Sequence, residues 1–109
     1  MRIIAIGTKK NDIWDVEISD ENTLETLQCL VEGYIELATP LILKKEGIEL
    51  IVNEEGLISL LPVNKNLFAT KDGLFIFGNA VIVGAGDEDF TGLTEDQVQF
   101  VKQWLDSKK

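Results

Sequence analysis

The sequence contains no histidine, and this absence removes much of the usual chemistry of enzyme sites. Catalytic triads and Cys–His pairs need an imidazole, and so do the common catalytic zinc sites. A general base near neutral pH would have to be a strongly shifted carboxylate or lysine. Cys29 is the single cysteine, so no intrachain disulfide can form. We therefore expect a protein that is not an enzyme, with no catalytic residue, no metal site and no cofactor.

Long hydrophobic runs are also lacking. No apolar stretch approaches the roughly 20 residues that a membrane helix needs. The apolar start of the chain, residues 1–6, is too short for a signal peptide and has no cleavage pattern after it. The sequence therefore predicts a cytoplasmic protein with no membrane partner, in the host cytoplasm if a phage encodes it.

Positive charge is scarce, with 10 basic against 19 acidic residues and a net charge of −9. Such a chain repels nucleic acid, so direct binding to nucleic acid is not expected. The acidic residues are dispersed, and the one acidic triplet, residues 87–89, is most simply a solvated loop.

The remaining composition indicates a globular fold. Hydrophobic residues make up 45% of the 109 residues, near the usual size of one domain, so we expect a single domain over residues 1–109. Apolar or alternating segments predict strands. Their ranges are 2–7, 13–18, 34–37, 49–52, 57–60, 74–77 and 80–83. Residues 53–56 and 78–79 are expected to be hairpin turns.

Two longer segments have the periodicity of amphipathic helices. The first is expected to begin at Asn22 as a capping residue, with Glu25 three residues on, and to end at Gly33. The second is expected to begin at Thr94, with Gln97 completing a capping box. The fold class is therefore α+β, a mainly antiparallel sheet with two principal helices.

Polar residues between the apolar segments are the candidates for ligand binding. Asn64, Lys65 and Asn66 form the richest donor cluster, and an ammonium with two amides suits a phosphate or a base edge. A loop that caps neighbouring backbone is the simpler interpretation of the same residues. Asn53 and Asn79 are weaker candidates, because each is more simply a turn residue.

Aromatic side chains offer a stacking surface for a purine. Trp14, Tyr34 and several phenylalanines are candidates, although most aromatics in a domain of this size belong to the core. Tyr34 follows the expected end of a helix, and it is the aromatic that we expect at the mouth of a pocket.

Four blocks of sequence together resemble a known family. They are VEGYIE at 31–36, IVNEEG at 51–56, LPVNK at 61–65 and GNAVIVG at 78–84. In this order they are similar to a domain-of-unknown-function family of small phage, plasmid and prophage proteins. The resemblance implies a mobile-element origin and no established catalysis.

Three functions are compatible with these features. The first, by analogy with small phage proteins, is counter-defence: a homo-oligomer that binds and sequesters a nucleotide-like immune signal without catalysis. The second is an acidic inhibitor that mimics DNA and blocks a restriction or CRISPR nuclease. The third is a Mg²⁺-dependent nucleotide hydrolase that uses Asp87, Glu88 and Asp89, and it has the least support.

Overall fold

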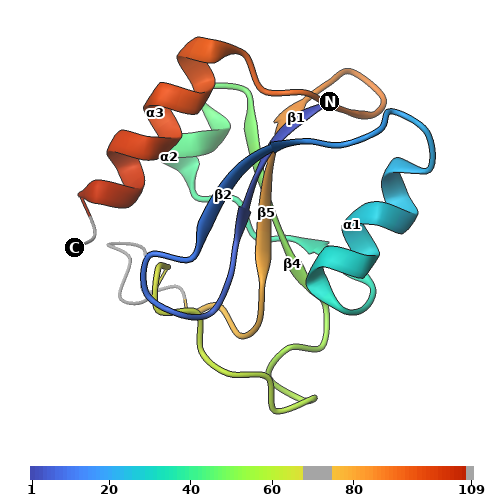
Figure 1. The fold of residues 1–109 in the computed structure, drawn as a ribbon, viewed down its shortest axis with the longest axis vertical. Helices are drawn as coiled ribbons and strands as arrows, with labels where there is room; N and C mark the ends of the chain where they lie inside the picture. Colours follow the sequence, from blue (N-terminus) through green and yellow to red (C-terminus); the bar gives the residue numbers. More distant parts are fainter. Residues whose placement is uncertain (68–74, 108–109) are drawn as a thin grey trace.

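A computed structural model describes residues 1–67 and 75–107. Six strands form one antiparallel sheet in the order β2-β1-β5-β4-β3, with β6 paired to β5 (Figure 1). The strands are β1 (Arg2–Ile6), β2 (Ile13–Glu17), β3 (Ile35–Leu37), β4 (Ile48–Asn53), β5 (Ala80–Ala85) and β6 (Phe90–Thr91). The helices are α1 (Thr23–Val31), the short α2 (Leu41–Lys44) and α3 (Glu95–Asp106). The predicted α+β class, with an antiparallel sheet and two principal helices, is confirmed.

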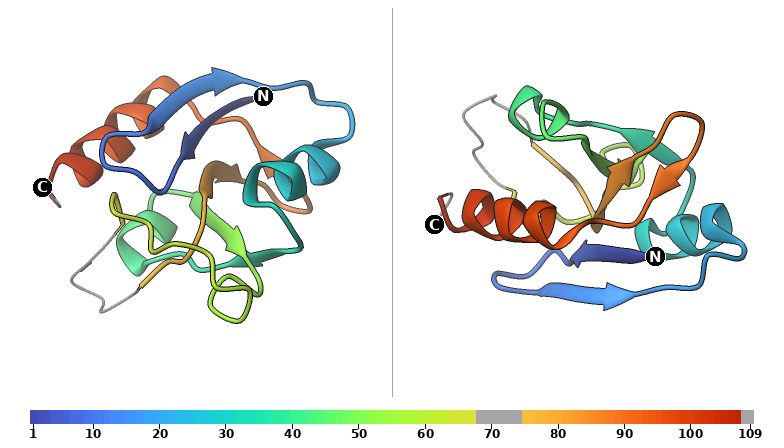
Figure 2. Two further views of the ribbon diagram at one scale, coloured as in Figure 1. Left: turned by 60° about the horizontal axis from the view of Figure 1, so that its bottom comes forward. Right: turned by 90° about the horizontal axis from the view of Figure 1, so that it is seen from above.

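The helices cover both faces of the sheet. On one face, Leu27 and Val31 of α1 pack in a cluster with Ile51 and Val81. The other face is covered by α2 and α3, and two views of the ribbon show α3 lying across the curved sheet (Figure 2). Because β1, β4 and β5 are buried on both faces, their sequences are almost continuously apolar.

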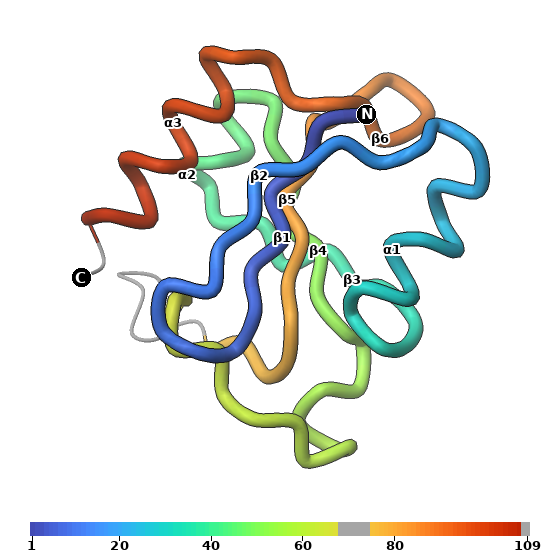
Figure 3. The backbone as a smooth tube through the Cα atoms, in the orientation of Figure 1, coloured from blue at the N-terminus to red at the C-terminus, as the bar shows by residue number. Residues whose placement is uncertain are grey.

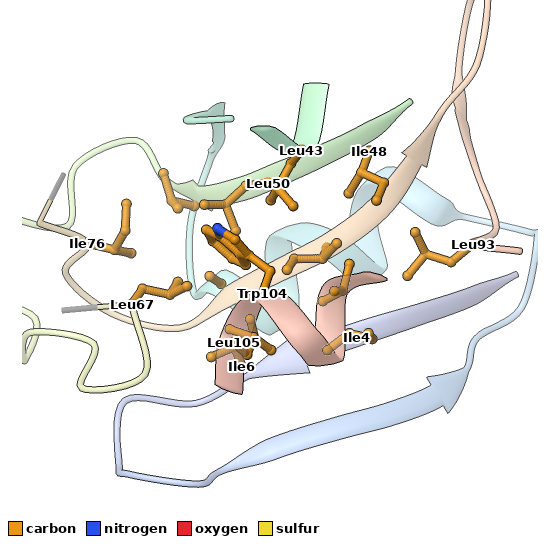
Figure 4. Close-up of a cluster of buried hydrophobic side chains, with 14 of the residues drawn as sticks. Ile4, Ile6, Leu43, Ile48, Leu50, Leu67, Ile76, Leu93, Trp104 and Leu105 are labelled. Carbon is orange, nitrogen blue, oxygen red and sulfur yellow. The ribbon is translucent and has the colours of Figure 1, made fainter. Parts of the chain in front are cut away.

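The larger core surrounds Trp104 of α3. Its side chain is almost wholly buried, among residues of β4, α2 and the segments that flank the gap in the described chain (Figure 4). The amphipathic character expected of this helix is confirmed, since its buried residues, Val98, Val101, Trp104 and Leu105, lie on one face.

The start of α3 follows the sequence prediction. The Thr94 side chain accepts a hydrogen bond from the Gln97 backbone, and the Gln97 side chain accepts one from the Thr94 backbone. This capping box satisfies two backbone donors that the first turn of a helix leaves free. Gln97 also donates to the carbonyls of Glu46 and Gly47, so the cap fixes α3 to the loop before β4.

The predicted start of α1 at Asn22 is confirmed, but the predicted capping at both ends is wrong. Asn22 precedes the helix but makes no side-chain capping bond, because it lies in the left-handed region with φ of 55°. At the other end, the left-handed residue is Glu32, with φ of 64°, and not Gly33. The buried residues of α1 are Leu27 and Val31, while Leu24 is about half exposed.

Two predicted strands are absent from the described chain. Residues 57–60 form successive turns, because Ser59 and Leu61 donate to the carbonyls of Glu55 and Gly56. Residues 75–77 run as an irregular segment whose one bridge joins Phe77 to Val63, and residue 74 lies outside the described residues. The backbone trace shows how the described chain after β4, up to residue 67, passes below the sheet (Figure 3). Consequently, the partners of β4 are β3 and β5.

No helix in residues 1–67 and 75–107 has the length and apolar character needed to span a membrane.

Candidate ligand-binding site

Asn64 is the centre of a buried hydrogen-bond network. Its side chain is fully buried, and its amide nitrogen donates to the carbonyls of Ile6, at 3.3 Å, and Gly78, at 3.0 Å. Its side-chain oxygen accepts from the Asn66 backbone at 3.0 Å. Asn64 therefore joins the end of β1 to the bend before β5, and both of its polar atoms are already paired.

Asn66 holds the turn between β1 and β2. Its amide nitrogen donates to the carbonyls of Gly7, at 2.9 Å, and Lys9, at 2.7 Å. Its oxygen accepts from the backbone of Asn11 at 2.8 Å, and Asn11 has the positive φ of 66° that the turn requires. This amide thus replaces backbone partners that a loop of irregular shape cannot supply.

The same junction brings lysines from distant parts of the chain together. The Lys65 backbone donates to the Thr8 carbonyl at 2.9 Å, directly beside Lys9 and Lys10. All three lysines are exposed. Among the described residues, no carboxylate forms an ion pair with any of their ammonium groups. The junction therefore brings the backbone of three exposed lysines together, and none of the three forms an ion pair within residues 1–67 and 75–107.

A hollow of about 180 Å³ lies at the base of this turn. Gly7, Asp12, Trp14, Leu30 and Asn79 are among its lining residues. Trp14 is 61% exposed, and its indole nitrogen donates to the Asp12 carboxylate at 2.5 Å, which orients the ring. Asn79 donates to the Leu30 carbonyl, and no described residue donates to its side-chain oxygen. The hollow therefore combines an aromatic surface with a free acceptor.

The predicted site residues fall into two groups. Asn64, Lys65 and Asn66 form the junction, and Asn79 lies close to it, next to the Gly78 carbonyl that Asn64 binds. Tyr34 and Asn53 lie at the same end of the sheet as Asn79 but further toward its β3 edge, since Val52 pairs with Ala80 and Asn53 pairs with Ile35. Tyr34 is 71% exposed, while Asn53 is buried and pairs both of its polar atoms, with the Val31 carbonyl and the Glu55 backbone. Ligand binding by all six residues stays a prediction.

Lys9 and Lys10 were not predicted as site residues, and Trp14 was one of several stacking candidates, of which Tyr34 was preferred. The sequence signal was present, since a lysine doublet occupies a turn in an acidic chain and Trp14 lies between Asp12 and Asp15 in a short polar segment. What the sequence could not supply was the contact between this turn and residues 64–66. Among the described residues, no group of three potential ligands is placed to hold a metal ion, and this includes Asp87, Glu88 and Asp89.

A family model of a domain of unknown function, DUF3846, matches residues 1–106. The chain belongs to this family. The DUF3846 match covers the junction, the hollow and every strand of the sheet. No curated protein and no solved structure is significantly similar to the chain.

Proposed function

We propose that this DUF3846 protein binds a small nucleotide-like molecule and sequesters it without catalysis. The observation that carries the proposal is the junction built by Asn64 and Asn66, which gathers Lys9, Lys10 and Lys65 beside a hollow containing Trp14. Lysine ammonium groups suit phosphate oxygens, and an exposed indole suits a nucleobase.

The hollow contributes recognition of the base. A base stacked on Trp14 would place its edge toward Asn79, whose free oxygen accepts a hydrogen bond from an exocyclic amine. At about 180 Å³ the hollow admits one ring system, and the phosphates would extend toward the lysines of the turn.

In its cellular setting we propose a counter-defence role. The resemblance to small phage, plasmid and prophage proteins supports such an origin, and a protein that only binds removes a signalling nucleotide from its receptor by mass action. A homo-oligomer is part of this proposal. Native mass spectrometry of protein purified from cells with active nucleotide signalling reports the subunit number and any retained nucleotide together.

Isothermal titration against cyclic nucleotides and ADP-ribose derivatives tests the proposal. We expect one compound class to bind, and the double variant Lys9→Ala/Lys65→Ala to weaken binding by about tenfold or more. The matched control is Lys44→Ala/Lys45→Ala, which removes two exposed lysines at α2. No binding across the panel, or equal loss in both double variants, would falsify the proposal.

The DNA-mimic alternative is supported by the net charge of −9. A mimic also needs carboxylates at phosphate-like spacing on one face, and the acidic residues lie on several different elements of the structure. Partner binding that does not weaken with added salt would exclude this alternative.

A further inference from the structure

A second candidate binding surface, separate from the junction of residues 64–66, is the outer edge of β3. This strand ends the sheet and pairs only with β4 among the described strands. The Glu54 backbone donates to the Tyr34 carbonyl, and the Ala38 backbone donates to the Leu50 carbonyl, both at 2.9 Å. Because hydrogen-bonded pairs alternate in an antiparallel ladder, the peptide groups of Ile35 and Leu37 point away from β4. No hydrogen bond among the described residues uses them.

An exposed apolar turn lies beside this edge. Leu57, Ile58 and Leu60 are 65%, 81% and 87% exposed. The turn that presents them is well anchored, because a Cβ atom at Gly56 would lie 2.4 Å from the Phe77 carbonyl oxygen. Such a cluster of large apolar side chains on a fixed turn is typical of a binding surface.

A cleft of about 250 Å³ connects the edge to the turn. Glu36 of β3, Leu57 of the turn and Phe75 all line it. Glu54 lines it as well, and neither Glu36 nor Glu54 has an ion pair among the described residues. Within the described part of the chain, the surface thus combines a strand edge without a partner, apolar side chains and two carboxylates without an ion pair.

We propose that this surface binds an extended segment of another protein in which apolar and basic side chains alternate, added as a strand to β3. Free peptide groups at a sheet edge supply the main-chain hydrogen bonds of such an addition. Successive side chains of the added strand point to opposite faces. Glu36, Glu54 and Leu57 line the same cleft, so the basic side chains on that face reach the carboxylates with their ammonium groups and pack their methylene stems on the apolar turn. The apolar side chains point to the opposite face, beside the exposed Leu37.

The negative charge of this surface favours binding of a basic segment from another protein over pairing with a second copy of this chain. In a two-fold symmetric pairing through β3, each copy would bring its own Glu36 and Glu54 toward the same seam. Like charges facing each other across strands are destabilising, and the net charge of −9 adds to the repulsion. A basic segment makes attractive contacts with the same carboxylates.

The test uses three synthetic peptides and fluorescence anisotropy. The first alternates lysine and valine, the second alternates glutamate and valine, and the third is the lysine peptide with alternate backbone nitrogens methylated. We expect the lysine peptide to bind, and the other two to bind about tenfold more weakly or not at all. Amide NMR shifts of the bound protein should concentrate at Ile35 and Leu37.

Variants locate the site. Glu36→Lys/Glu54→Lys and Leu57→Ser/Ile58→Ser should each weaken the lysine peptide by about tenfold. The matched controls are Glu21→Lys/Glu25→Lys, which makes the same charge change near α1, and Leu24→Ser, which removes an exposed leucine there. Circular dichroism melting of every variant shows that it is folded.

Three results would overturn the proposal. If Glu21→Lys/Glu25→Lys weakens binding of the lysine peptide as much as Glu36→Lys/Glu54→Lys does, the peptide is attracted by net charge alone. Unchanged affinity after backbone methylation would exclude strand addition. A wild-type dimer by light scattering that Leu57→Ser/Ile58→Ser converts to a monomer would show that a second copy occupies the surface.

Discussion

Asn53 and Asn79 donate hydrogen bonds to consecutive backbone carbonyls of α1. The Asn53 amide nitrogen lies 2.9 Å from the Val31 oxygen, and the Asn79 amide nitrogen lies 3.1 Å from the Leu30 oxygen. The last carbonyls of a helix have no partner within it. Asn53, at the end of β4, and Asn79, just before β5, therefore cap the C-terminal end of α1.

Alanine at either position should loosen this end of α1. We expect Asn53→Ala and Asn79→Ala each to lower the free energy of unfolding by about 1–2 kcal/mol, with Asn53 costing more because it is buried. The double variant should cost less than the sum, since either single change already frays the shared helix end. Urea denaturation measures these energies. Additive losses, with unchanged hydrogen exchange in the last turn of α1, would contradict shared capping.

Replacement of the buried Asn64 should lower the free energy of unfolding more than replacement of its exposed neighbour Lys65. Asn64→Ala leaves the carbonyls of Ile6 and Gly78 without their donor, and we expect a loss of about 2–4 kcal/mol in urea denaturation. Lys65→Ala, in the same loop, should change the stability by less than about 0.5 kcal/mol. Similar losses for both variants would show that the loop tolerates replacement of its buried amide.

Stability should fall at acid pH through an ion cluster of four residues, in which Lys102 also pairs with Asp15 at 3.4 Å. Arg2 pairs with Asp15 of β2 and Glu95 of α3, and these contacts hold the pKa of both carboxyls below their ordinary values of 3.8 and 4.5. The unfolded chain then binds more protons than the folded one in this range. The stabilisation by these ion pairs is complete at a pH above the ordinary pKa values of the two carboxyls. It is lost as the pH falls through their lowered pKa values in the folded protein.

The variant Arg2→Gln isolates this contribution. Thermal melts between neutral pH and about pH 3 should show a lower melting temperature for the variant near pH 7 and a smaller difference at low pH. Lys44→Gln, which removes a lysine with no ion pair among the described residues, is the control and should follow the wild-type curve. A constant difference between Arg2→Gln and wild type at every pH would show that Arg2 stabilises the fold by packing alone.

The sequence predicted the elements whose signals are local. The apolar runs of β1, β4 and β5 identified strands because burial on both faces leaves little room for polar residues. The Thr94–Gln97 box identified the start of α3 because both partners lie within one turn.

The failures have a common physical cause. Residues 57–60 are apolar and β-like, but they have no strand to pair with and fold as turns that leave three large side chains exposed. Likewise, the partners of Asn64 lie 14 and 58 residues away, so no local pattern could show that its amide is used internally. Contacts of this range depend on the fold and not on spacing.

Trp14 provides an optical test of the proposed site. It is 61% exposed while Trp104 is 7% exposed, so iodide should quench mainly the Trp14 fluorescence. A nucleotide stacked on Trp14 should also quench this emission and protect it from iodide. In Trp14→Phe both effects should disappear, while the remaining Trp104 signal reports that the core is intact. Nucleotide quenching that persists in Trp14→Phe would place the ligand elsewhere.

Leu60 is a site where a substitution should raise stability. It has φ of 56°, in the left-handed region, and it is 87% exposed, so it has little packing to lose. A left-handed residue with a side chain costs roughly 1–2 kcal/mol, and glycine avoids this cost but loses more chain entropy on folding. We expect Leu60→Gly to raise the free energy of unfolding by about 0.5–1 kcal/mol in urea denaturation. The control is Ile58→Gly, in the same turn without a positive φ, and it should be destabilising because only the entropy term applies. If both glycine variants are destabilised alike, the left-handed conformation of Leu60 carries no strain.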